Sequence, residues 1–175
     1  MDADLGLEGA KIQFAKVFGS FMVHALKGPP SEEAKRGEVG ELEATPVQQQ
    51  IVNQYAQFFV AAQNKEVLHM ALDHVSDVIL KMQEADEHGI CARAAEYFDQ
   101  TFKRPFFKLE KSIHNNWRLH KAFYEALGSL CLTTGDRAEA KEIVTMMLGT
   151  VKSKTCSMPV KREITERLAR LITTR

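Results

Sequence analysis

The sequence predicts an all-α protein, a short α-solenoid of about seven helices arranged as antiparallel helical hairpins. Two features of the 175 residues favour this class. Only ten glycines and five prolines interrupt long stretches of good helix formers such as alanine, glutamate, lysine and leucine. Apolar residues recur at intervals of three and four, and nowhere do they alternate with polar residues as in a β-strand.

The N-terminal helix is predicted over residues 8–27, because its apolar side chains fall on one face. That face consists of Ile12, Ala15, Phe18, Met22 and Leu26. Pro29 and Pro30 end the helix, so residues 1–30 form an N-terminal helical segment. Residues 31–44 are rich in glutamate and nearly lack large apolar side chains, which predicts an exposed acidic linker.

Residues 45–175 are predicted to be the helical-repeat domain. Its first helix extends to residue 62 and begins with Thr45 as the N-cap, a proline at the first helical position, and Gln48 placed to complete a capping box. A polar break at 63–65 precedes a second helix over 66–84, and we expect the two helices to pair as an antiparallel hairpin. The apolar face of the second helix contains Leu68, Leu72, Val75, Ile79 and Met82.

Turn and cap signals divide the rest of this domain into further helices. Pro105 is predicted to open a short helix of its own, the asparagines at 115–116 to break the chain, and Gly135 to close a helix in the left-handed conformation. Asp136 is the predicted N-cap of the next helix, with Glu139 at the capping-box position. The helices predicted from these signals cover residues 88–100, 104–114, 117–133, 136–152 and 157–175.

An internal repeat is visible at an offset of 69 residues, which superposes 51–82 on 120–151. In both copies a tyrosine lies 16 residues before an alanine, so an aromatic ring on one helix can pack against a small residue on the next. These pairs are Tyr55 with Ala71 and Tyr124 with Ala140. The offset is about twice the 34–35-residue period of tetratricopeptide- and pentatricopeptide-type helical hairpins. It predicts three hairpins in register, the middle one formed by 88–100 and 104–114.

Over 120–151 the sequence resembles the pentatricopeptide-repeat family. The residues that match the family pattern are Tyr124, Leu127, Gly135, Ala140 and Met147. The other units depart from it: Glu66 stands where the turn glycine belongs, and the middle unit has Ile90 for the tyrosine and Phe106 for the alanine. The alternative is that any antiparallel array of helices places aromatic residues and alanines in this way.

This resemblance implies binding of single-stranded RNA, with one base read by a polar side chain just after each tyrosine position. Those positions hold Ala56, Cys91 and Glu125. Alanine offers no side-chain hydrogen bond, and a carboxylate repels phosphate. We therefore expect that base reading is absent and that the helical array binds other proteins.

Residues suited to catalysis or metal binding are scattered along the chain. The sequence has no glycine-rich phosphate loop and no serine-nucleophile or zinc-protease motif, and Glu110 with His114 is more often a surface pair than a pair of metal ligands. Cys91, Cys131 and Cys156 are far apart, which favours a reducing compartment. We expect no enzyme activity, no cofactor and no metal. No apolar run reaches the roughly 18 residues that a membrane span needs.

The strongest candidate for partner binding is a basic stretch of six residues. It comprises Lys103, Arg104, Lys108, Lys111, Arg118 and Lys121. Phe102, Phe106, Phe107 and Trp117 are interleaved with them, a combination that suits an acidic protein surface or, through phosphate contacts and stacking, RNA. The alternative is that the phenylalanines fill the core and the basic side chains are merely solvated.

These observations predict a non-catalytic subunit of a larger protein complex. In size and helical architecture the chain is similar to accessory subunits on the catalytic head of mitochondrial ATP synthase in euglenozoan protists. That resemblance implies attachment to the ATP synthase α subunit and a mitochondrial location. No transit peptide is visible, and a cytoplasmic location is the alternative. Two other functions stay open: an organellar single-stranded RNA-binding factor and a peptide-binding adaptor.

Overall fold

A computed structural model describes residues 2–27, 44–61, 64–134 and 136–173. Within these ranges the chain forms seven α-helices and no β-strand, which confirms the predicted all-α class. The helices are α1 (Asp2–Ala25), α2 (Pro46–Ala61), α3 (Lys65–Gln83), α4 (Ala92–Ile113), α5 (Trp117–Thr133), α6 (Arg137–Lys152) and α7 (Met158–Thr173). None of these helices is long and apolar enough to cross a membrane.

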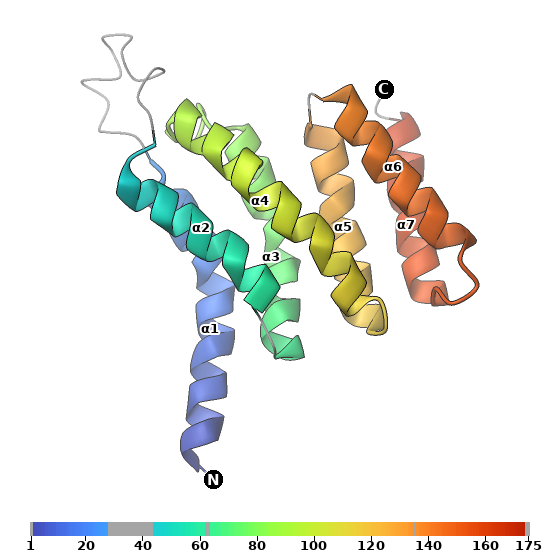
Figure 1. Cartoon of the computed structure of the whole chain (residues 1–175), viewed down its shortest axis with the longest axis horizontal. Coiled ribbons are helices and arrows are strands. Elements are labelled where there is room, and N and C mark those ends of the chain that lie inside the picture. Colours follow the sequence, from blue (N-terminus) through green and yellow to red (C-terminus); the bar gives the residue numbers. More distant parts are fainter. Residues whose placement is uncertain (1, 28–43, 62–63, 135, 174–175) are drawn as a thin grey trace.

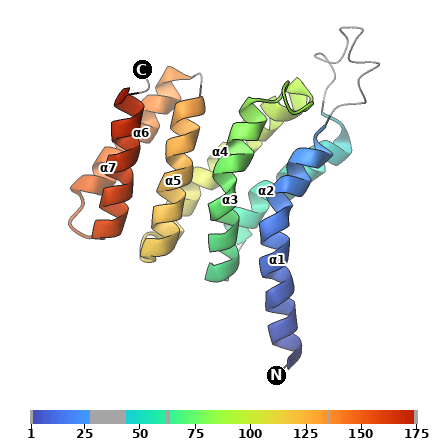
Figure 2. The ribbon, with the colours of Figure 1, turned by 180° about the vertical axis from the view of Figure 1, so that it is seen from behind.

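The helices alternate between two layers along the chain (Figure 1). One layer contains α1, α3, α5 and α7, which pack side by side in that order, as Figure 2 shows from the opposite side. The other layer contains α2, α4 and α6, of which α2 packs closely along α4. Helices that follow each other in the chain make smaller contacts between the layers.

A single hydrophobic core runs through both layers, from Ala15 on α1 to Ile164 on α7. Its centre is a row of aromatic rings. The rings of Phe98, Phe102 and Phe106 on α4 are stacked, with centroids 4.9 and 5.1 Å apart, and Phe123 on α5 extends the row at 4.9 Å from Phe106. The contact of Phe106 on α4 with Phe123 on α5 thus connects the two layers.

Helix α4 corrects one prediction, because the separate helices expected over 88–100 and 104–114 are one continuous helix with Pro105 inside. An internal proline costs a helix about 3 kcal/mol, since it lacks the backbone N–H and crowds the preceding turn. The stacked row of three phenylalanines stays on one face only if the helix continues past this proline. Burying each ring contributes about 1.5–3 kcal/mol, which outweighs that cost. The predicted middle hairpin is therefore wrong, and so is the register of three hairpins.

Local capping signals act as predicted at two helix starts. At α2 the Thr45 N–H donates to Gln48 Oε1 at 2.9 Å, and the Gln48 N–H donates to Thr45 Oγ1 at 3.3 Å, which forms both bonds of a capping box. Asp136 caps α6 by accepting two backbone N–H groups at 2.8 and 3.4 Å. The capping box expected at α6 does not form, because the carboxylate of Glu139 binds Lys103 on α4 instead.

The packing of the helices differs from the predicted hairpin of 46–62 with 66–84. Both helices form, but α2 lies mainly against α4, and α3 lies mainly against α1 and α5. Ala44, at the end of the predicted acidic linker, is buried. The predictions for residues 28–43 and for Gly135 lie outside the described residues.

Candidate partner-binding site

The six basic residues of the predicted partner-binding stretch do not form one surface. Four of them lie on α4 and two on α5. Lys103 faces α6, Lys121 reaches a carboxylate on α7, and Arg118 lies beside the indole of Trp117 at the start of α5. The other three, Arg104, Lys108 and Lys111, point away from the core on α4. The six residues therefore have different surroundings.

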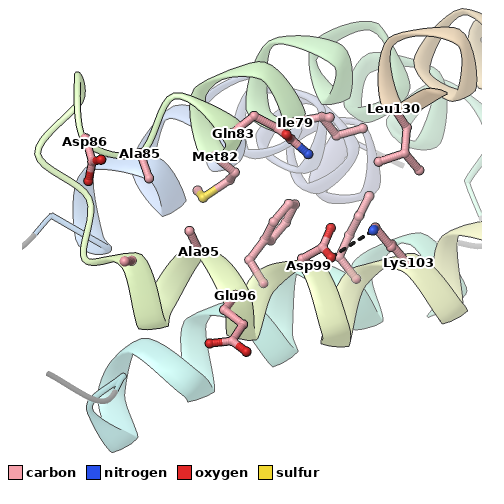
Figure 3. A pocket seen from close by; sticks show the side chains of 13 residues that line it. Ile79, Met82, Gln83, Ala85, Asp86, Ala95, Glu96, Asp99, Lys103 and Leu130 are labelled. Atoms are coloured by element: carbon pink, nitrogen blue, oxygen red, sulfur yellow. Dashed lines mark ion pairs between the residues drawn. The ribbon is translucent and has the colours of Figure 1, made fainter. Parts of the chain in front are cut away.

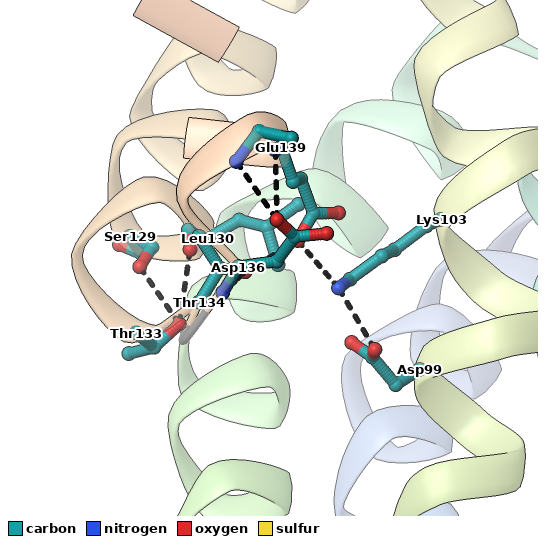
Figure 4. Close-up of polar contacts among 9 residues, drawn as sticks. Asp99, Lys103, Ser129, Leu130, Thr133, Thr134, Asp136 and Glu139 are labelled. Atoms are coloured by element: carbon teal, nitrogen blue, oxygen red, sulfur yellow. Dashed lines mark hydrogen bonds and ion pairs between the residues drawn. The ribbon is translucent and has the colours of Figure 1, made fainter. Parts of the chain in front are cut away.

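Lys103 lies in an ion-pair cluster between α4 and α6 (Figure 4). Its Nζ is 2.6 Å from Glu139 Oε2 and 2.8 Å from Asp99 Oδ2, and its side chain is only 17% exposed. Glu139 also accepts a hydrogen bond from the hydroxyl of Thr134. Burial lowers the pKa of Lys103, but the hydrogen bonds and negative charges of Asp99 and Glu139 outweigh it and raise the pKa above its usual value. Lys103 is thus charged and already neutralised within the fold.

Lys121 belongs to a second network, which joins α5 to α7. Its Nζ is 3.4 Å from the buried carboxylate of Glu163, which also accepts a hydrogen bond from Arg167 Nε at 2.8 Å. Arg167 Nη2 in turn donates to Glu125 at 2.9 Å. Glu125 is one of the three positions expected to read a base, and the other two, Ala56 and Cys91, are buried. Ala56 and Cys91 are therefore covered by the fold, and Glu125 is paired with Arg167.

Arg104, Lys108 and Lys111 form the remaining group, here called the basic row. They lie at intervals of four and three on α4, so they share the face opposite the buried phenylalanines, and all three are exposed. No ion pair joins any of them to an acidic side chain within the part of the chain that the structure describes. The row is a concentrated positive charge held on a rigid helix.

The aromatic residues expected to accompany the basic stretch have mostly structural roles. Phe102 and Phe106 are fully buried in the ring stack, so they cannot stack on a nucleic-acid base. Phe107 is half-buried beside the basic row. Trp117 is exposed, with the Arg118 guanidinium 5.5 Å from its ring centroid. The alternative reading, that the phenylalanines fill the core, is thus confirmed for Phe102 and Phe106.

Two hollows flank Lys103. A polar cleft of about 970 Å³ separates α4 from α6 and is lined by residues that include Arg104, Phe107 and Glu142. A smaller cavity of about 300 Å³ lies between α3, α4 and α5 (Figure 3). Its lining includes the apolar side chains of Met82 and Leu130 and the carboxylate-bearing residues Asp86, Glu96 and Asp99. The cleft and the cavity share Asp99 and Lys103 and so adjoin each other.

A buried histidine was missed by the sequence analysis. His120 Nε2 lies 3.1 Å from Glu110 Oε1, and burial lowers the pKa of His120 although the charge and hydrogen bond of Glu110 oppose this shift. Glu110 therefore contacts His120 and not His114, the residue with which its spacing in the sequence would pair it. His114 Nδ1 instead lies 2.8 Å from the carbonyl of Lys111. Across the described residues no group of three or more histidine, cysteine or acidic side chains is placed to hold a metal ion.

Comparison with known proteins gives no family for this chain: no protein-family model matches it, and no curated protein or solved structure is significantly similar to it. The resemblances drawn from the sequence therefore stay predictions.

Proposed function

We propose that the chain is a non-catalytic, protein-binding subunit of a multiprotein assembly, and that its fold is a short α-solenoid. The alternation of helices between two layers supports the solenoid, because in such folds each unit contacts mainly its neighbours along the array. Solenoids present extended surfaces on their outer helices. Such surfaces commonly bind other macromolecules.

The observation that carries this proposal is the basic row on α4. Arg104, Lys108 and Lys111 are exposed and have no carboxylate partner among the described residues, whereas Lys103 and Lys121 are neutralised within the fold. Charges that the fold does not use attract a partner of opposite sign and orient it on approach. The row therefore favours an acidic protein surface.

The specific partner that we propose is the α subunit of the catalytic head of mitochondrial ATP synthase, with this chain as a peripheral subunit. The support is the resemblance in chain length and helical architecture. The proposal places the chain in mitochondria. A cytoplasmic assembly with an acidic docking surface is the alternative location.

A second candidate function is a peptide-binding adaptor. The cleft between α4 and α6 favours it, because a hollow of this size with polar and aromatic walls suits an extended peptide. RNA binding has less support, since Ala56, Cys91, Phe102 and Phe106 are all buried.

The proposal is tested with the triple variant R104E/K108E/K111E. Tagged wild-type and variant chains are purified gently from their native cells, and the proteins that accompany them are identified by mass spectrometry. We expect the wild type to retain the ATP synthase α subunit and the variant to lose it, because the charge of the row is reversed. The matched control is K141E/K152E/K154E, which makes the same charge change at exposed positions on α6 and just after it.

Two results would overturn the proposal. One is a triple variant that folds and stays in its complex as well as the control variant does. The other is tight binding of single-stranded RNA at physiological salt, with a slope of log affinity against log salt that falls by about two units in the triple variant. The second result would establish the RNA-binding alternative.

A further inference from the structure

A groove lies between the beginnings of α5 and α7 and is here called the α5–α7 groove. The two helices pack side by side and begin at the same end of the molecule (Figure 2). The groove has a volume of about 950 Å³. Trp117 lines it from α5, and Met158 and Pro159 line it from α7. It is therefore separate from the cleft between α4 and α6.

The apolar side chains of the α5–α7 groove are exposed. Trp117 is 47% exposed and Met158 is 74% exposed, and Pro159 is exposed beside them. Single apolar side chains on a surface are common, but here three of them line one hollow. Tryptophan and methionine are both enriched where proteins bind each other, because one supplies a large rigid ring and the other adapts its shape. Such a hollow favours a partner that covers it.

The carboxylates that line the groove are already paired with cations of the fold. Glu163 is buried, and its carboxylate lies 2.8 Å from Arg167 Nε and 3.4 Å from Lys121 Nζ. Glu166 lies 3.5 Å from Arg162 Nε one turn away on α7. These ion pairs match Lys121, Arg162 and Arg167 with carboxylates, so these three cations add little net positive charge to the groove.

Two further cations at the groove lack such a match. Lys161 lines the groove and is half-buried. Arg118 is exposed, and its guanidinium lies 5.5 Å from the ring centroid of Trp117. Within the described part of the chain, no ion pair joins either of them to an acidic side chain. The groove therefore combines an apolar hollow with two positive charges that the fold does not neutralise.

This combination favours an acidic protein segment over RNA. RNA carries a phosphate at every nucleotide, and some of these phosphates would meet the carboxylates of Glu163 and Glu166. Met158 and Pro159 also offer no aromatic ring on which a base could stack. A peptide, in contrast, can place an apolar side chain in the hollow and a carboxylate only where a cation awaits it.

We propose that the α5–α7 groove binds a segment of another protein in which a large apolar residue is flanked by aspartate or glutamate. The apolar side chain would pack against Trp117 and Met158, and the flanking carboxylates would pair with Lys161 and Arg118. The inference rests on the proposed function, in that it assumes a partner protein, but it concerns a surface separate from the basic row on α4.

A displayed library of random peptides is the probe. Peptides that bind the double variant M158Q/K161E are removed first, and the remaining ones are selected on the full wild-type chain, so the peptides retained are those that need the groove. We expect them to be enriched in aspartate and glutamate next to leucine, phenylalanine or tryptophan. Circular dichroism and thermal denaturation establish that the double variant folds as the wild type does.

Single variants then measure the contribution of each part of the groove. The most enriched peptide is labelled with a fluorophore and titrated with the full chain while anisotropy is measured. We expect M158Q and K161E each to weaken binding by about tenfold, and replacing the acidic residues of the peptide with their amides to do the same. The matched controls are I172Q, which removes an equally exposed apolar residue at the other end of α7, and K141E, which makes the same charge change at an exposed position on α6. Both should change the affinity by less than about twofold.

The triple variant R104E/K108E/K111E separates this test from that of the proposed function. We expect it to retain the peptide, because the basic row lies on α4 and does not line the groove. A triple variant that stays in its complex would overturn the proposed role of the row and leave this peptide measurement unaffected.

Any of four results would overturn the proposal. These are a selection that retains no peptides or peptides without acidic residues, a loss of affinity in I172Q as large as in M158Q, a single-stranded oligouridine that binds more tightly than the peptide and is released by K161E, and self-association in sedimentation that M158Q abolishes. The third result would assign the groove to RNA, and the fourth to a second copy of the chain.

Discussion

Lys103 joins α4 to α6, and removing its charge measures how much this contact stabilises the fold. The variant Lys103→Met keeps the apolar stem but leaves Glu139, which is 11% exposed, without the cation that lies 2.6 Å from it. Removing one partner of a fully buried ion pair costs about 3–5 kcal/mol. Because Asp99 is 44% exposed and water reaches the cluster from that side, we expect a smaller loss of about 2 kcal/mol.

The measurement is urea denaturation followed by circular dichroism, on Lys103→Met, Glu139→Gln and the double variant. The double-mutant cycle isolates the interaction of the two side chains, and we expect a coupling energy of about 1–2 kcal/mol. Lys108→Met is the control, because it removes a lysine from the exposed side of the same helix. Its free energy of unfolding should stay within about 0.5 kcal/mol of the wild type.

A coupling energy near zero, or a loss in Lys103→Met no larger than in Lys108→Met, would refute this reasoning. Either result would mean that solvent screens the cluster as it screens an ordinary surface pair. Partner binding gives an independent check. Because Lys103 is neutralised by Asp99 and Glu139, its removal should weaken partner binding less than the removal of Lys108 does.

Three further predictions concern single side chains. Burial holds the pKa of His120 below its usual 6.5, so the unfolded chain binds the proton more readily than the folded chain does. The free energy of unfolding should therefore be highest above pH 6.5 and fall as the pH drops below 6.5. Urea titrations at several pH values should show a weaker fall in His120→Gln than in the wild type. Pro105→Ala restores a backbone N–H donor inside α4 and should stabilise the fold by about 1–3 kcal/mol, measured by thermal denaturation. A melting temperature below that of the wild type would contradict this and would mean that the packing of α4 requires a bend at the proline. Gly19→Ala places a methyl group against Val78 and should cost about 1–3 kcal/mol, part of which the added substitution Val78→Ala should restore.

The signals that predicted structure correctly are those that act within one helical turn. Thr45 and Gln48 bind each other's backbone across three residues, and Asp136 caps α6 through the next two or three residues. Such bonds depend on little beyond the local sequence. The apolar face predicted for 66–84 is likewise buried, because the period of a helix fixes which side chains share a face.

The packing between helices could not be predicted in the same way. The repeat aligns Tyr55 with Tyr124, and both are buried, but their neighbours differ. The ring of Tyr55 lies among other aromatic rings, with its centroid 5.3 Å from that of Phe18 and 5.6 Å from that of Phe102. The hydroxyl of Tyr124, by contrast, lies 2.5 Å from Thr150 Oγ1. A periodic pattern states which face of a helix is buried. It does not state which other helix covers that face.

In the candidate site, the contacts between helices were likewise not predictable from the sequence, but the shared face of the basic row was. The spacing of Arg104, Lys108 and Lys111 places them on one face of a continuous helix, with Lys103 about 100° to the side. Predicting separate helices over 88–100 and 104–114 left Lys103 between them and so concealed this relation. Asp99 lies one turn before Lys103 on α4 and is a local partner. The partners that join Lys103 and Lys121 to other helices, Glu139 and Glu163, are 36 and 42 residues away, and no local pattern indicates them.

The basic row recognises a partner through charge at a distance, so it accelerates association and its effect weakens as salt screens it. Raising the salt concentration should therefore reduce the rate at which the chain associates with its partner, while the dissociation rate changes little. R104E/K108E/K111E should lose most of this salt dependence. A salt dependence as steep in the variant as in the wild type would mean that other charges steer association.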